Sequence, residues 1–415
     1  MIAADEIARR IERFRQVRDP SVIWPDVPAA AVHRSLDEIT RVSAALLART
    51  PTPIRLLPPP DVSPTAFGVA AFMSGMGPLL GYWREQGLLL APDGLATLLA
   101  VHLDHGRRRA ARLRDELESI LAAFGEHGIP VLVLKGGHTA YRYFPEPGTR
   151  PATDIDVLLR PLDIAPAGRL LHALGFTEVD TFGLPHRSHW ARPARQTVAS
   201  LEVAHADNPW SLDVHASLDR PYSPGVLARF GNIDFSRGEP WDGLSRPTLV
   251  LRQPLLTAYL ACNASGDLAN LSLLRLAELV LVAQRDFGTA QAWGALEALL
   301  ADTRTERFAF PSLELAERFV PGTLPPDVRA RLAARTPARL RRRVARTTPA
   351  SAQSLKPLPW DEKLIWAASP REYGAYLLHL VWPYTLSRPS RLRDAVANQG
   401  RRLRRVLHSL LLGKR

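Results

Sequence analysis

The chain has 415 residues, which is enough for two or three domains with substantial hydrophobic cores. Its single cysteine, Cys262, excludes an internal disulfide and is typical of a reducing compartment, so we expect a cytoplasmic protein. The formal net charge is +12, but residues 331–415 hold 19 of the 53 basic side chains and only 4 of the 41 acidic ones. The basic balance therefore belongs to the C-terminal tail, the rest of the chain is close to neutral, and the overall charge says little about an active site.

Residues 1–127 are expected to form a helical N-terminal region. The first residues have the pattern of an amphipathic helix with charges from residue 5, which is not the pattern of a secretory signal. A proline-containing loop at residues 19–28 separates this helix from a second one, and the proline-rich stretch 51–65 predicts a stiff linker.

Residues 62–83 carry no charged side chain and are long enough to span a membrane. Their glycines, prolines and moderate hydropathy favour a pair of buried helices instead. Apolar residues at helical spacing over residues 97–124 predict a long amphipathic helix. We expect this helix to pack on a sheet and to lead into a strand at residue 131.

A lysine and two glycines follow that strand. The apolar run 131–134 has the length and composition of a strand, and Lys135, Gly136 and Gly137 come directly after it, before about two helical turns. A Gly-Gly turn that leads into a helix presents backbone N–H groups to an anion, most often a phosphate. Lys135 is also the only lysine among the first 355 residues, which suggests that this position needs a compact ammonium group.

Two aspartates lie on the next predicted strand. Asp154 and Asp156 are two residues apart, so their side chains share one face, while Ile155, Val157 and Leu159 are expected to face the core. Neighbouring carboxylates repel each other unless a cation lies between them, and a divalent hard metal ion is the usual cation. Together with the phosphate-binding turn, this pair indicates phosphoryl or nucleotidyl transfer.

A third carboxylate is expected on a neighbouring strand. Residues 197–203 and 210–216 are interpreted as a hairpin, because the residues between them have turn chemistry. Asp213 and His215 share one face of the second strand, and Asp213 is the candidate third metal ligand. Glu202 on the partner strand is the alternative to Asp213. His215 is a further candidate site residue, with a purely structural histidine as the competing interpretation.

The rest of the chain is expected to be helical from residue 248 to about residue 345. A tail follows, with arginine clusters, an apolar segment at residues 373–386 and a basic helix from about residue 390. The expected fold class is α+β, with a small mixed β-sheet core flanked by helical N- and C-terminal regions. We divide the chain into a helical N-terminal region (1–127), an α/β core (128–247), a helical domain (248–335) and a basic helical tail (336–415).

These motifs, in this order, resemble the uncharacterised nucleotidyltransferase family of the DNA polymerase β-like superfamily. The resemblance runs from about residue 90 to about residue 330 and includes the Leu-Arg-Leu-Ala-Glu-Leu segment at 274–279. Gly137 stands where many members of the superfamily have serine, which removes one hydroxyl ligand for phosphate. The motifs that carry the resemblance are Leu134-Lys135-Gly136, Arg150, Asp154-Ile155-Asp156 and Leu212-Asp213-Val214-His215.

The resemblance implies a palm-like core and a Mg²⁺-dependent transferase. It would move a nucleoside monophosphate from an NTP such as ATP to a hydroxyl group and release pyrophosphate. Asp154 and Asp156 would hold two Mg²⁺ ions, and Asp213 would complete the ligand shell of one of them. The acceptor would be a small molecule, a sugar, a peptide or a protein, as for accessory enzymes of biosynthetic clusters.

The same resemblance assigns roles around the phosphates. Gly136 and Gly137 would bring backbone N–H groups to the β and γ phosphates. Lys135 or Arg150 would neutralise charge on the leaving pyrophosphate.

Other partners and functions stay open at this point. The arginine-rich tail fits a solvated face on packed helices, an anionic membrane surface at the inner side of the membrane or, less well, a nucleic acid. An RNA-directed, toxin-like transferase would use the tail as an electrostatic clamp, and its binding would weaken steeply with salt. A non-catalytic NTP-binding protein would bind NTP and magnesium without releasing pyrophosphate.

Overall fold

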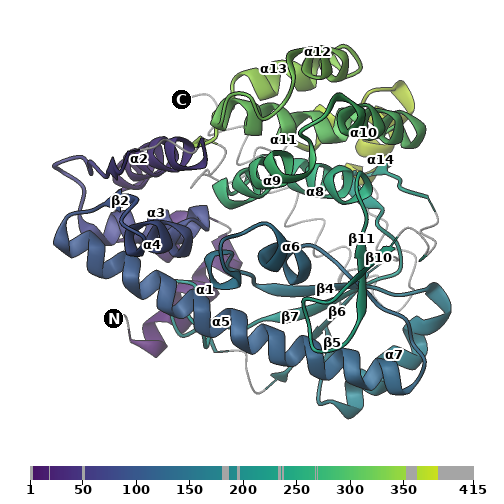
Figure 1. Cartoon of the computed structure of the whole chain (residues 1–415), viewed down its shortest axis with the longest axis horizontal. Coiled ribbons are helices and arrows are strands. Elements are labelled where there is room, and N and C mark those ends of the chain that lie inside the picture. The colour runs from purple at the N-terminus through teal and green to yellow at the C-terminus, as the bar shows by residue number, and fades with distance from the viewer. Residues whose placement is uncertain are drawn as a thin grey trace.

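A computed structural model of the chain describes residues 3–17, 19–48, 52–179, 187–193, 197–231, 235, 238–266, 268, 270–351 and 362–381. Figure 1 shows three adjoining parts: N-terminal helices, a central mixed sheet and a stack of C-terminal helices. The expected α+β fold class, with helical regions before and after a mixed sheet, is confirmed.

Seven strands form the central sheet of the described chain, in the order β10-β11-β3-β4-β7-β6-β5. Strand β4 pairs in parallel with β7 and antiparallel with β3, which makes the sheet mixed. These strands are β3 (Leu132–Val133), β4 (Asp154–Leu158), β5 (Thr177–Val179), β6 (Arg187–Ala191), β7 (Ser211–His215), β10 (Gly238–Trp241) and β11 (Thr248–Leu251). Two small sheets pair β1 (Ile54–Arg55) with β2 (Leu89–Leu90) and β8 (Arg220–Ser223) with β9 (Val226–Ala228).

The N-terminal helices confirm the helical reading of this region. The uncharged residues 62–83 contribute to two largely buried helices, and no described helix is long and apolar enough to cross a membrane. The longest helix, α5, runs from these helices to the edge of the sheet beside α7 (Figure 1). The helices before the sheet are α1 (Ala4–Val17), α2 (Ala29–Leu47), α3 (Pro64–Ser74), α4 (Gly77–Glu85) and α5 (Asp93–Glu126).

The two faces of the sheet have opposite chemistry. Ile155 and Val157 of β4, with Leu212 and Val214 of β7, belong to an apolar cluster with α5 and α7 (Ile164–Ala173). The alternate residues of the same strands point to the other face, which lies toward the short helix α6 (Gly136–Arg142) and the C-terminal helices. The strand period of two therefore separates an apolar face from the face that carries the aspartates.

The C-terminal helices cover that second face. Every residue of α8 is buried, which explains its apolar sequence all round the helix. The helices are α8 (Leu255–Ser265), α9 (Leu273–Asp286), α10 (Ala290–Thr303), α11 (Glu306–Phe319), α12 (Pro326–Ala334), α13 (Ala338–Ala345) and α14 (Pro370–Val381). Helix α14 covers part of the predicted apolar segment 373–386, whereas the basic helix predicted from residue 390 lies outside the described residues.

Two sequence-based expectations about strands are wrong. Residues 197–203 form no strand, and the antiparallel partner of β7 is β6, at residues 187–191. Residues 248–251 are the strand β11, between β10 and β3, so the helical segment begins at Leu255 instead. Asn208 explains the irregular segment, because its side chain accepts from the N–H groups of Ala199 and Ser200 and donates to the carbonyl of Ser200.

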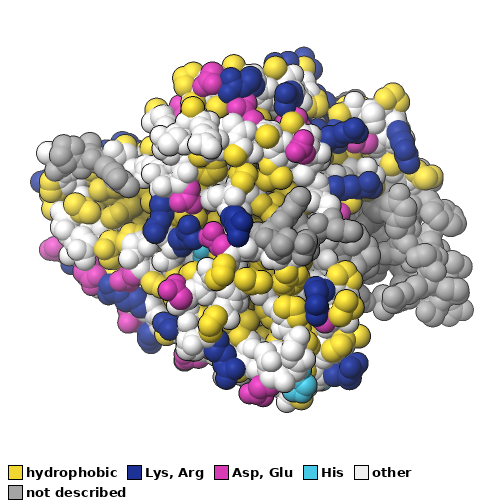
Figure 2. Space-filling view, turned by 45° about the vertical axis from the view of Figure 1, so that its right-hand side comes forward, with side chains coloured by type: hydrophobic (Ala, Val, Ile, Leu, Met, Phe, Trp, Pro, Cys, Tyr) yellow, Lys and Arg dark blue, Asp and Glu magenta, His cyan; other side chains and the backbone are white. Residues whose placement is uncertain are grey.

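The surface of the described body has mixed charge. On the face that Figure 2 shows, Lys and Arg side chains are interspersed with Asp and Glu side chains. Many surface arginines of the described residues form ion pairs, such as Arg107 with Glu85 at 2.6 Å and Arg331 with Glu297 at 2.7 Å. This pattern agrees with a chain whose excess positive charge is concentrated in the tail.

Candidate active site

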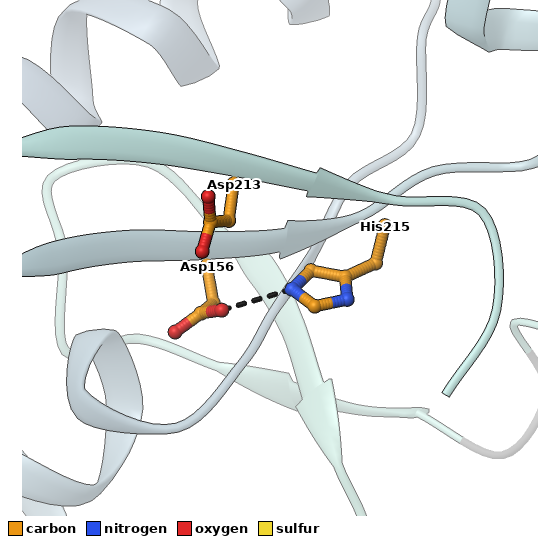
Figure 3. Close-up of side chains that lie close together, drawn as sticks. All are labelled: Asp156, Asp213 and His215. Atoms are coloured by element: carbon orange, nitrogen blue, oxygen red, sulfur yellow. Dashed lines mark hydrogen bonds and ion pairs between the residues drawn. The ribbon is translucent and has the colours of Figure 1, made fainter. Parts of the chain in front are cut away.

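Three adjacent strands place charged side chains on one face of the sheet. Asp156 of β4 is the register partner of Asp213 of β7, which in turn is the partner of His189 of β6. His215 lies two residues further along β7 on the same face. Figure 3 shows Asp156, Asp213 and His215 together, and one ligand atom of each lies within 4.8 Å of those of the other two.

Asp156 is buried and holds two partners on a single oxygen. Its Oδ1 is 2.8 Å from the Lys135 ammonium group and 2.9 Å from Nε2 of His215. Burial opposes ionisation of Asp156, but the charge of Lys135 and the contact with His215 outweigh it and hold the pKa of this carboxyl below its usual range. Burial also lowers the pKa of His215, so its imidazole is neutral at neutral pH.

Asp213 is fully buried beneath two side chains of β6. His189 lies with Nδ1 2.7 Å from Oδ1 of Asp213, and the Arg187 guanidinium contacts the other oxygen. These two residues were not found from the sequence. The sequence pattern that could have indicated this strand is the alternation of Arg187 and His189 with Ser188 and Trp190. This pattern is weak, because only Trp190 is strongly apolar.

Asp154 lies on the same face, next to Asp156, and is partly exposed. Burial, together with the negative charge of Asp156, raises the pKa of the Asp154 carboxyl above its usual range. The structure thus gives the two aspartates of the predicted pair opposite pKa shifts. Opposite pKa shifts of neighbouring carboxyls are typical of functional sites. The raised pKa indicates that the ionised form of Asp154 is unfavourable without a nearby cation.

Replacing Asp154 by asparagine is expected to stabilise the metal-free protein at neutral pH. A raised pKa means that the folded chain binds a proton more tightly than the unfolded one, so this carboxyl contributes stability at low pH that is lost as the pH rises through the folded pKa. The Asp154→Asn variant should melt about 1–3 °C higher near pH 7. Below about pH 3.9, where both states of Asp154 are protonated, the difference should vanish. Thermal melts at both pH values in a chelating buffer test this, and an unchanged or lower Tm near pH 7 contradicts it.

The Lys135-Gly136-Gly137 turn has a specific backbone conformation. Lys135 has φ of 41°, which is costly for a residue with a side chain and is found where the surroundings enforce it. The turn places the Lys135 ammonium on Asp156 and starts α6 at Gly136. The N–H groups of Gly136 and Gly137 are the first two of this helix, and no carbonyl of the same helix can accept from them.

Arg150 packs directly against this turn. Its Nε and Nη2 donate to the carboxylate of Glu278 on α9, at 2.8 and 3.1 Å, and Thr139 of α6 also contacts that carboxylate. A Cβ atom placed on Gly136 would lie 2.2 Å from Nη1 of Arg150. Glu278, which the sequence did not single out, therefore holds Arg150 beside the turn and ties the turn to the C-terminal helices.

Replacing Gly136 by alanine is expected to destabilise the protein by about 2–4 kcal/mol. The new methyl group would push the Arg150 guanidinium away from Glu278 and leave a buried carboxylate poorly paired. Gly294, exposed in the middle of α10 with nothing within 4 Å of its Cβ position, is the matched control. Gly294→Ala should instead gain about 0.5–1 kcal/mol. Urea denaturation compares the two, and equal stabilities would contradict the assignment.

Arg109 of α5 joins the loops that precede the two carboxylate strands. Its guanidinium is almost fully buried, and it donates to the carbonyls of Ala152 at 2.6 Å, His205 at 3.1 Å, Asn208 at 2.8 Å and Pro209 at 3.0 Å. Burial lowers the pKa of Arg109 to about 10, so the group stays charged at neutral pH. Arg109 thereby fixes the spacing between the chain segments that enter β4 and β7.

The cavity beside Asp154 is small. Residues of α5 and α6 line it together with Arg150 and Asp154, and its volume is about 30 Å³. This space suits about one water molecule and not a nucleobase.

Glu202 does not lie where the sequence analysis expected it. It belongs to the irregular segment before β7, and its backbone N–H donates to the Ser200 hydroxyl. The strand pairing that made it an alternative to Asp213 is absent from the described structure. The buried ligand group contains Asp213 and His215 instead.

Comparison with protein-family models identifies the family. Residues 65–321 match the model described as uncharacterised nucleotidyltransferase, and the chain belongs to this family. The match confirms the resemblance expected from about residue 90 and extends it to the start of α3. No curated protein and no solved structure matches the chain.

The donor set at this site fits a divalent metal ion. Asp156, Asp213 and His215 offer two carboxylates and a neutral imidazole, which are all common ligands of divalent ions. Without such an ion, Lys135 pairs with Asp156 and Arg187 contacts Asp213, while His215 and His189 add hydrogen bonds but no positive charge, because burial lowers the pKa of both. The chemistry of the donors therefore supports the predicted metal dependence of a nucleotidyltransferase.

Proposed function

We propose that the protein transfers a nucleoside monophosphate from an NTP to a hydroxyl acceptor, with Mg²⁺ as the metal and release of pyrophosphate, by polymerase β-like chemistry. The observation that carries this proposal is the register pairing of Asp156 with Asp213, beside a lysine-bearing glycine turn, in a chain of a nucleotidyltransferase family. The acceptor class is a small molecule, a sugar, a peptide or a protein.

Asp154, Asp156 and Asp213 would hold the metal. When bound, metal ions in such sites polarise the transferred phosphoryl group and stabilise the attacking and leaving oxygens. The raised pKa of Asp154 supports its inclusion, because a nearby cation would remove the repulsion from Asp156.

The groups around the turn would bind the triphosphate. Gly136 and Gly137 would donate their backbone N–H groups to phosphate oxygens. Lys135 pairs with Asp156 at 2.8 Å, and a metal that neutralises Asp156 would make the ammonium group available for the pyrophosphate. Glu278 accepts from Nε and Nη2 of Arg150, and the third nitrogen, Nη1, lies next to Gly136. Nη1 would therefore be placed to donate to a phosphate bound at the turn.

Labelling with the four NTPs tests the proposal. The protein is incubated with Mg²⁺, a host extract and each NTP, labelled either at the α or at the γ phosphate. The expected result is a labelled product with α-label only, accompanied by pyrophosphate. Label transferred from the γ position would indicate a phosphoryl transferase, and magnesium-dependent NTP binding without any pyrophosphate release would indicate a non-catalytic NTP-binding protein.

A further inference from the structure

His215 stands out among the groups at the site because it offers a nitrogen ligand. It lies on β7 two residues after Asp213, on the same face of the sheet, and is buried. Its Nε2 is 2.9 Å from Oδ1 of Asp156, and the ligand atoms of all three residues fit within 4.8 Å (Figure 3). The imidazole therefore faces the same point as the two carboxylates.

The separation of these atoms matches that of two ligands of one ion. Adjacent ligands of an octahedral ion with bonds of about 2.1 Å lie about 3 Å apart. The distance of 2.9 Å from Nε2 to Oδ1 is close to this value, so these two atoms are near enough to each other to bind one ion.

A nitrogen ligand changes which ion the site prefers. Mg²⁺ binds oxygen ligands and holds its waters tightly, whereas imidazole binds first-row transition ions with increasing affinity from Mn²⁺ onward. A site made only of aspartates has a weaker preference for transition ions over Mg²⁺. Two aspartates and one histidine favour the transition ion.

We propose that Nε2 of His215 is a metal ligand and that this site therefore binds divalent first-row transition ions, Mn²⁺ included, more tightly than Mg²⁺. The inference rests on the proposed function, since it concerns the same site, and it concerns the relative affinity of that site for Mg²⁺ and for transition ions. The competing role for His215 is a hydrogen bond that only orients Asp156.

Electron spin echo spectroscopy with Mn²⁺ alone, without nucleotide, separates these two roles. A directly bound imidazole nitrogen modulates the echo of Mn²⁺, and a hydrogen-bonded histidine outside the ligand shell does not give that directly coordinated signal. We expect nitrogen modulation in the unmodified protein and its loss in His215→Gln. His189, which contacts Asp213 but lies outside the ligand group, gives the matched control: His189→Gln should keep the modulation.

Competition between ions gives a second measurement. Mn²⁺ should bind at least about 10-fold more tightly than Mg²⁺ to the unmodified protein, and this ratio should fall about 10-fold in His215→Gln. Bound Mn²⁺ without nitrogen modulation in the unmodified protein would overturn the proposal, whether or not the variant folds. Modulation that disappears in His189→Gln but stays in His215→Gln would also overturn it.

The failure of this proposal is distinct from failure of the proposed function. Pyrophosphate release from an NTP with Mg²⁺ is measured on the same preparation. Release of pyrophosphate together with an all-oxygen Mn²⁺ signal would reject His215 as a ligand and leave nucleotidyl transfer standing. Nitrogen modulation without any pyrophosphate release would support His215 as a metal ligand and reject nucleotidyl transfer.

Discussion

Asp156→Asn is expected to lower the rate of nucleotidyl transfer by at least about 10³-fold, because the metal that Asp156 would hold supplies several kcal/mol of transition-state stabilisation. Asparagine keeps an oxygen at the position of Oδ1, so Lys135 and His215 can still donate to it and the fold should persist. The measurement is transfer of α-label from the NTP, with circular dichroism to confirm the fold.

The control for this variant is a second buried aspartate away from the polar face. Asp163, at the start of α7, pairs with Arg160 at 2.5 Å and makes no contact with the other site residues in the described structure. Asp163→Asn should leave transfer within about 2-fold of the unmodified protein, since it touches no group of the site. Transfer by Asp156→Asn at the level of Asp163→Asn would remove Asp156 from the reaction.

Arg109→Met is expected to cost about 3–5 kcal/mol of folding stability. Methionine fills much of the volume but leaves the carbonyls of Ala152, Asn208 and Pro209 without a donor. These three residues are half-buried, and a carbonyl that loses its donor inside the protein costs about 1–3 kcal/mol. The measurement is the urea midpoint of unfolding, with metal binding followed in parallel because the same loops lead into β4 and β7.

Its neighbour Arg108 is the matched control. Arg108 lies on the same helix, is exposed and pairs with Asp104 one turn away. An exposed pair of this kind contributes little, so Arg108→Met should change stability by no more than about 0.5 kcal/mol. Equal midpoints for the two variants would show that the Arg109 hydrogen bonds do not hold the loops together.

The parts of the site that the sequence predicted share a short-range signal. Lys135, Gly136 and Gly137 follow a strand directly, and the two aspartates alternate with apolar residues on a single strand. Periodicity and turn composition are local properties, so one stretch of chain is enough to detect them. Asp213 was found in the same way, because Leu212 and Val214 flank it and both face the apolar side of the sheet.

The parts that the sequence did not predict depend on long-range contacts. Arg109 and Glu278 act on residues 43 to 139 positions away, and although Glu278 lies in the segment 274–279, nothing local in the sequence indicates its contact with Arg150. Residues 197–203 contain enough apolar residues to resemble a strand, but Asn208 bonds to their backbone and holds them in a turn. The sequence does not predict strand β6, because Arg187 and His189 are charged or polar. These side chains suit a buried sheet only because Asp213 lies on the adjacent strand β7.

The strand β11 and the Arg150–Glu278 pair together determine where the chain can be cut. A fragment of residues 128–247 would match the α/β core that composition alone suggests, yet it would end before β11 and before Glu278. Its β3 would have an open hydrogen-bonding edge, and Arg150 would keep its charge with no acid to meet it. We expect such an excised core to aggregate on expression, and a fragment of residues 65–321, which keeps α5 and the helices through α11, to stay monodisperse on a sizing column. In this chain we therefore expect the central sheet and the C-terminal helices that cover it to unfold together as one cooperative unit.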